Sequence, residues 1–277
     1  MRVALKVSLI AIILLLLGGG MCITAFAAPK AELWPRWQAN DAQNSVRVDH
    51  SVWTEFLEKY LVVSNSGTVN LVRYAEVNSS DKDSLAQYLA ELSAVPISKL
   101  NRVEQKAVWI NLYNALTIHT ILDHYPVKSI RDISSGWFSS GPWDLKLVKV
   151  EGIKVSLNDI EHRILRPIWQ DNRVHYAVNC ASLGCPNLQP EAFTAENMEQ
   201  LLNKAARAYV NSSRGVDLIA GKLTLSNIYD WFQVDFGGSE VTLLAHLDKF
   251  AAPALAAKLK SYRGTIVYKY NWDLNEI

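Results

Sequence analysis

The chain has 277 residues, a formal net charge of +1 and an apolar fraction of 49%. This length permits one large domain or two small ones, and a nearly neutral charge argues against nucleic acid as a partner. Three cysteines are too few for a scaffold built on disulfides, so a packed apolar core must hold the fold.

The first 27 residues have the pattern of a secretory signal peptide. Arg2 and Lys6 give a positive start, residues 8–17 are apolar, and the small-residue sequence AFA ends at Ala27. A membrane span needs about 20 residues, and this apolar run is shorter. The alternative to a cleaved signal peptide is an uncleaved membrane anchor. We therefore expect cleavage, export to the periplasm or the exterior, and no stable membrane span in the mature chain. Loss of the two cations changes the formal charge from +1 to −1.

Residues 28–47 are polar and contain prolines, which predicts a flexible N-terminal arm, and a single domain is expected over 48–277. Its fold class is predicted to be α+β, with several helices packed on an antiparallel sheet. Apolar spacing and capping residues predict helices that start at Ser51, Ser80 and Asn101, a helix over 157–166, one over about 195–210, and one from Ser239 to Pro253. Strands are expected as hairpins around Glu151-Gly152 and Ala220-Gly221, over 173–179, and near 264–272.

The helix from Asn101 to about His124 is apolar on almost all sides, which predicts burial. Glu104, Asn111 and Asn114 lie on one face of it. Buried amides need hydrogen-bond partners. The two asparagines therefore either brace a neighbouring loop or line a site and position its groups.

In the helix 157–166, Glu161 falls within the apolar stripe and His162 on its flank. A buried carboxylate is costly unless it is paired, so Glu161 is expected to contact a cation or a group of N–H donors. A structural ion pair and a functional site both satisfy this need. The nearest cationic candidates in the sequence are Arg166, Arg173 and His175.

The segment RVHYAVNCASLGCP, residues 173–186, holds the two cysteines of the mature chain. As a strand, it would place His175 roughly 16 Å from Cys180, too far to act as its base. Asn179 is then expected to cap a short helical turn that starts at Cys180, where N–H groups favour a thiolate. Cys185 ends that turn. His162, from another element, is the expected base.

Five ordered blocks resemble the domain-of-unknown-function family 547: AVWINLYNALTIH, LNDIEHRILRP, HYAVNCASLGCP, IYDWFQVDFG and YKYNWDLN. The resemblance runs from about residue 50 to 277. It implies the domain assignment but no substrate. The family motif positions are Asn111, Asn114, Glu161, His162, His175, Asn179, Cys180, Ser182 and Cys185.

Four functions fit these residues. The first is a cysteine-dependent hydrolase or acyl transferase for a small molecule or peptide, with Cys180 as nucleophile and His162 as base; a papain-like or transglutaminase-like site is an analogy only. The second is a Cys180–Cys185 disulfide, structural or redox-active. The third is a non-enzymatic binding domain of the envelope. The fourth is a metal site made of His162, His175, Cys180 and Cys185, which no ligand spacing supports. We expect no cofactor and no metal.

Overall fold

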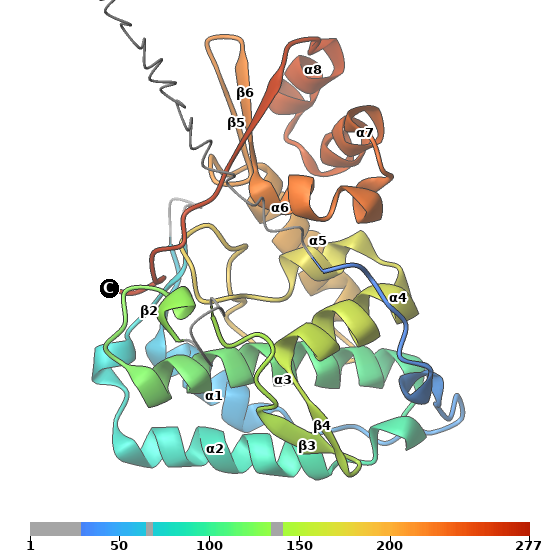
Figure 1. Ribbon diagram of the computed structural model, residues 1–277, viewed down its shortest axis with the longest axis vertical. Helices are drawn as coiled ribbons and strands as arrows, with labels where there is room; N and C mark the ends of the chain where they lie inside the picture. Colours follow the sequence, from blue (N-terminus) through green and yellow to red (C-terminus); the bar gives the residue numbers. More distant parts are fainter. Residues whose placement is uncertain (1–28, 65–68, 134–140) are drawn as a thin grey trace, which may run out of the picture.

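A computed structural model describes residues 29–64, 69–133 and 141–277, so the expected signal peptide lies outside the described residues. The fold is α+β, as predicted (Figure 1). The α-helices are α1 (Ser51–Tyr60), α2 (Ser79–Ala94), α3 (Arg102–His124), α4 (Arg166–Trp169), α5 (Met198–Val210), α6 (Asn227–Trp231), α7 (Glu240–Phe250) and α8 (Pro253–Ser261). The strands are β1 (Leu61–Val62), β2 (Leu71–Val72), β3 (Val148–Val150), β4 (Ile153–Val155), β5 (Val216–Ile219), β6 (Lys222–Ser226) and β7 (Ile266–Lys269).

Helix α3 is the centre of the larger apolar core, and α1, α2 and the hairpin β3–β4 lie around it (Figure 1). Asn101 caps its first turn by accepting hydrogen bonds from the N–H groups of Val103 and Glu104. Almost every residue from Glu104 to Ile121 is buried, which agrees with the apolar character of this helix on all sides. The helix therefore provides a rigid base on which other segments are held.

A second apolar core lies between α5, α7, α8 and the sheet β5-β6-β7. Strands β5 and β6 form the predicted hairpin, whose turn residues Ala220 and Gly221 have φ angles of 49° and 77°. Strand β7 pairs with β6 in parallel, so this sheet is mixed rather than antiparallel throughout. The parallel pairing follows from the chain's return through α7 and α8, because parallel neighbours need a long crossover.

The expectation of a flexible arm over 28–47 is wrong for the residues that the structure describes. The Glu32 and Trp34 N–H groups donate to the carbonyls of His162 and Arg163, at 2.9 and 3.0 Å. Trp37 is buried and packs edge-on against Trp109 of α3. Two tryptophans thus anchor a segment whose other residues are mostly polar.

The C-terminal segment runs from β7, beside the second core, to the larger core, where it ends next to β2 (Figure 1). There the Val72 N–H donates to the Asn275 carbonyl, and residues 271–275 bond to the segment 181–184 on the way. The last residues of the chain therefore tie the two cores together next to the cysteines. No helix in the described part of the chain is long and apolar enough to cross a membrane.

Candidate functional site

The segment that leads to Cys180 is not a strand. Residues Asn172–Tyr176 form a 3₁₀-helix, which starts where the Asp171 side chain accepts a hydrogen bond from the Arg173 N–H. All residues from Val174 to Asn179 are buried, so the alternation of polar and apolar letters does not separate an inner from an outer face. The expected distance of roughly 16 Å between His175 and Cys180 assumed an extended strand and is therefore wrong. Both side chains line the same cavity.

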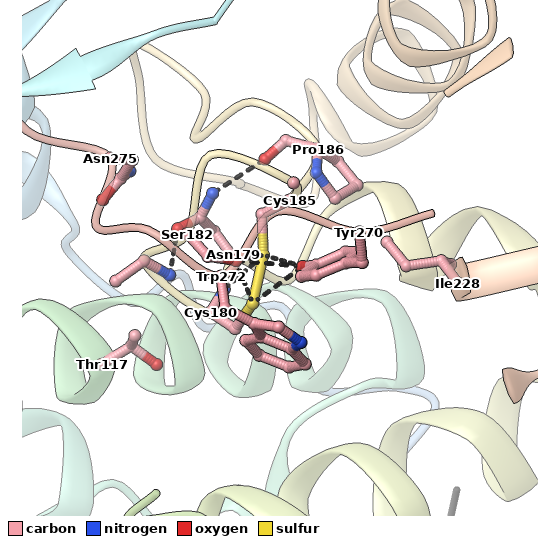
Figure 2. The surroundings of a disulfide bond; sticks show 12 residues. Thr117, Asn179, Cys180, Ser182, Cys185, Pro186, Ile228, Tyr270, Trp272 and Asn275 are labelled. Atoms are coloured by element: carbon pink, nitrogen blue, oxygen red, sulfur yellow. Dashed lines mark hydrogen bonds between the residues drawn. A yellow bond between two sulfur atoms is a disulfide. The ribbon is translucent and has the colours of Figure 1, made fainter. Parts of the chain in front are cut away.

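Cys180 and Cys185 form a disulfide (Figure 2). No helical turn starts at Cys180, contrary to the expectation, because Ala181 has a left-handed φ of 57° and Ser182 bridges to Leu274. Asn179 still orders the turn: its Oδ1 accepts from the Ala181 N–H, and its Nδ2 donates to the Pro186 carbonyl.

The backbone around Cys185 is held by partners from three elements. Arg214 donates to the carbonyls of Leu183 and Cys185, and the Tyr209 hydroxyl donates to the Gly184 carbonyl at 2.7 Å. The N–H groups of Leu183 and Gly184 donate to the C-terminal segment. The loop is therefore positioned by its surroundings and not by its own secondary structure.

The two sulfurs differ in environment. Cys180 is partly exposed to the cavity, whereas Cys185 is only 3% exposed. The Cys185 Sγ accepts a hydrogen bond from the Cys180 N–H at 3.0 Å. The Tyr270 hydroxyl lies 3.1 Å from the Sγ atom of each cysteine. The Ser182 hydroxyl lies 3.1 Å from the Cys180 Sγ and 3.6 Å from the Cys185 Sγ. Figure 2 shows Tyr270 directed at the disulfide, with the ring of Trp272 beside Cys180.

Asn111 and Asn114 do not line the cavity; they brace loops. Asn114 donates to the Ala177 carbonyl at 2.9 Å and accepts from the Asn179 N–H at 2.8 Å. Asn111 makes the same pair of bonds to the backbone of Phe193, at 2.7 and 3.0 Å. Of the two, Asn114 therefore fixes the segment that carries the cysteines.

A cavity of about 410 Å³ lies between the two apolar cores. The disulfide, Tyr270, Glu161, His162 and His175 all line this cavity. Partly exposed aromatic rings also line the cavity: Trp143, Trp231, Phe232 and Trp272.

The helix that carries Glu161 is a π-helix over Asp159–Leu165, in which the Arg166 N–H donates to the Glu161 carbonyl. A π-helix is wider than an α-helix and is often found at functional sites. It allows the adjacent side chains of Glu161 and His162 to face one cavity. The α-helical spacing predicted correctly that Glu161 is buried. It did not predict that the neighbouring side chain of His162 faces the same cavity.

Glu161 is buried, and its nearest basic atom is the His175 Nδ1, 3.7 Å from its Oε1. The His162 Nδ1 lies 4.0 Å from the same oxygen. Neither distance is a hydrogen bond. Burial together with the Glu161 charge raises the pKa of Tyr113, on α3, well above its usual value.

The two histidines of the cavity are linked to each other through Asp235 and Arg166. The His175 Nε2 lies 2.7 Å from Asp235 Oδ2, and the Arg166 Nε donates to the same oxygen at 2.6 Å. Burial would raise the pKa of Asp235, but the bonds from His175 and Arg166 outweigh it and lower the pKa to about 2. Burial lowers the pKa of His162 to about 4, so its ring is neutral at pH 7. Its Nδ1 then accepts a hydrogen bond from Arg166 at 3.0 Å.

A metal site finds no support. His162, His175 and the cysteines line one cavity, but both sulfurs are in the disulfide. Within residues 29–64, 69–133 and 141–277, no group of three or more histidine, cysteine or acidic side chains is arranged to hold an ion.

Residues 97–210 match the family model described as "Protein of unknown function, DUF547". This match supports, over the matched residues, the resemblance to the DUF547 family that the sequence blocks indicated. No curated protein and no solved structure matches it.

Sequence reasoning missed several groups of the site. Asp235 and Tyr270 belong to the blocks IYDWFQVDFG and YKYNWDLN, which lie outside the matched range. Tyr113 stands between the two asparagines that were singled out. Nothing in the sequence marks Arg214 as part of the site, because it follows two serines in a segment without a motif.

Proposed function

We propose that the chain is an exported protein that exchanges its Cys180–Cys185 disulfide with the thiol groups of a small-molecule or peptide substrate in the cavity. The observation that carries this proposal is the asymmetry of the two sulfurs. Both cysteines line the cavity, but Cys180 is partly exposed, whereas Cys185 is only 3% exposed and accepts a hydrogen bond from the Cys180 N–H; the Tyr270 hydroxyl lies 3.1 Å from each sulfur. An accessible sulfur for attack and a stabilised sulfur for departure are what disulfide exchange requires.

In the forward step, a substrate thiolate attacks the Cys180 Sγ. The bond between the two protein sulfurs breaks, and its electron pair leaves on Cys185 as a thiolate. The Cys180 N–H and the Tyr270 hydroxyl are placed to donate hydrogen bonds to the departing Cys185 sulfur. A second substrate thiolate then attacks the substrate sulfur of the mixed disulfide and releases Cys180. The substrate loses two electrons and the protein gains them, and a low-molecular-weight disulfide would reoxidise the protein.

Export supports this chemistry, because disulfides persist in oxidising compartments outside the cytoplasm. The pattern of the first 27 residues is the basis for proposing export. The rigid attachment of the loop by Arg214 and Tyr209 also favours exchange, since it holds the attacked bond in one orientation.

The test is the oxidation of a peptide with two thiols by the mature protein, with oxidised glutathione present as the terminal oxidant. The wild type should turn over. In a single turnover without glutathione, Cys180→Ser and Cys185→Ser should both fail to oxidise the peptide, because neither variant has a disulfide that the substrate thiolate can open. If the native disulfide survives an excess of thiol until the protein unfolds, it is structural and the proposal fails.

A second candidate is hydrolysis or acyl transfer by the reduced protein, with Cys180 as nucleophile. It is favoured by the presence of Cys180, His162 and His175 around one cavity. Its signature would be cleavage of activated esters only after reduction, lost in Cys180→Ser. No thiol exchange would then be needed for turnover.

A further inference from the structure

The aromatic wall of the cavity is a connected group of four rings: Trp143, Trp231, Tyr270 and Trp272. The Trp272 ring centroid lies 4.6 Å from that of Tyr270, 5.5 Å from that of Trp231 and 5.7 Å from that of Trp143. All four side chains are partly exposed and line the cavity. Large aromatic surfaces that stay open inside a cavity mark a binding site for a ligand that can contact ring faces.

A cation already lies on this group of rings. The guanidinium carbon of Arg131 lies 5.3 Å from the centroid of Trp272, within the range of a cation–π contact. Arg131 also lines the cavity, so Trp272 shows that a ring of this group can hold a cation there.

The Glu161 carboxylate adds a negative charge to the same cavity. It is only 7% exposed, and the nearest basic nitrogen atoms, on His175 and His162, are 3.7 and 4.0 Å away. His162 is neutral at pH 7, because burial lowers its pKa to about 4. The Arg166 guanidinium donates instead to Asp235, the Pro29 carbonyl and His162. Among the described residues, no basic nitrogen lies within hydrogen-bond distance of this carboxylate, so a cationic ligand would stabilise it.

We infer that the cavity binds ligands through an alkylammonium group, which lies between the four aromatic rings and the Glu161 carboxylate. Aromatic faces combined with a carboxylate are a usual way to recognise such groups. A volume of about 410 Å³ suits a small ligand or one side chain of a peptide. Binding of an alkylammonium group does not depend on the proposed function. If the bound ligand is also the substrate of disulfide exchange, which rests on that proposal, the substrate is an aminothiol.

The test is calorimetric titration of the oxidised mature protein with choline and with its neutral isostere 3,3-dimethylbutan-1-ol. Choline should bind at least about tenfold more tightly, because the two probes differ chiefly in charge. Capped tripeptides with a central lysine or norleucine form a second pair and distinguish a peptide from a free amine as the source of the ammonium group. Equal binding of the two members in both pairs, or binding of none, overturns the inference.

Two variants refine the test. Glu161→Gln should weaken choline binding about tenfold and leave the isostere unchanged. Glu104→Gln is the matched control, because Glu104 is a carboxylate that is 1% exposed and lies outside the cavity. It should leave choline binding unchanged. If both variants weaken binding alike, Glu161 has no specific role. The probes carry no thiol, so failure here leaves the disulfide-exchange proposal standing.

Discussion

Replacement of Asn114 by alanine would remove the two hydrogen bonds that hold the backbone before Cys180. The Ala177 carbonyl and the Asn179 N–H would each lose a buried partner, formerly at 2.9 and 2.8 Å. An unsatisfied buried group costs about 1–3 kcal/mol, so the variant should lose about 2–6 kcal/mol of unfolding free energy. This loss is a large part of the about 5–15 kcal/mol that stabilises a typical domain.

Asn111→Ala is the matched control, because Asn111 lies on the same helix, is equally buried and makes the same two bonds to Phe193. Urea unfolding should show a similar loss of stability in both variants. The rate at which dithiothreitol reduces the native disulfide should change only in Asn114→Ala, measured below the urea transition. Equal reduction rates in the two variants would refute the claim that Asn114 positions the cysteine loop.

Two further predictions concern protons. Burial lowers the pKa values of His50, His162 and His246 to about 4, whereas unfolded histidines titrate near 6.5. The unfolded chain therefore binds more protons between these values, and stability should fall by up to about 1.4 kcal/mol per pH unit and per histidine as the pH drops from 6.5 to 4. A constant urea midpoint over that range would be contrary evidence. Tyr270→Phe should slow reduction of the disulfide about tenfold, since it removes a hydrogen bond to the departing Cys185 thiolate; stopped-flow kinetics that match the wild type would exclude this role.

Local patterns predicted much of the fold. The apolar run after Asn101 predicted a buried helix, and Glu151-Gly152 and Ala220-Gly221 predicted two hairpins, because each signal acts within a few residues. Pro253 predicts only the end of the preceding helix, but α8 begins there, because proline is also favoured at the first turn of a helix.

The site was predicted only in part. Glu161, His162, His175 and Cys180 do line one cavity, but the reasoning that excluded His175 depended on a strand that is absent. Alternation of letters cannot distinguish a strand from a short helix when every residue is buried. Asp235 and Tyr270 come from distant parts of the chain, and only tertiary packing brings them to the site.

The central claim is that Cys180 is the sulfur that a thiol attacks. The direct measurement exposes the oxidised protein briefly to cysteamine, quenches in acid, alkylates free thiols, and locates both modifications by fragmentation of the peptide that contains residues 180–185. We predict cysteamine on Cys180 and the alkyl group on Cys185. Cysteamine on Cys185 with the alkyl group on Cys180 would contradict the account.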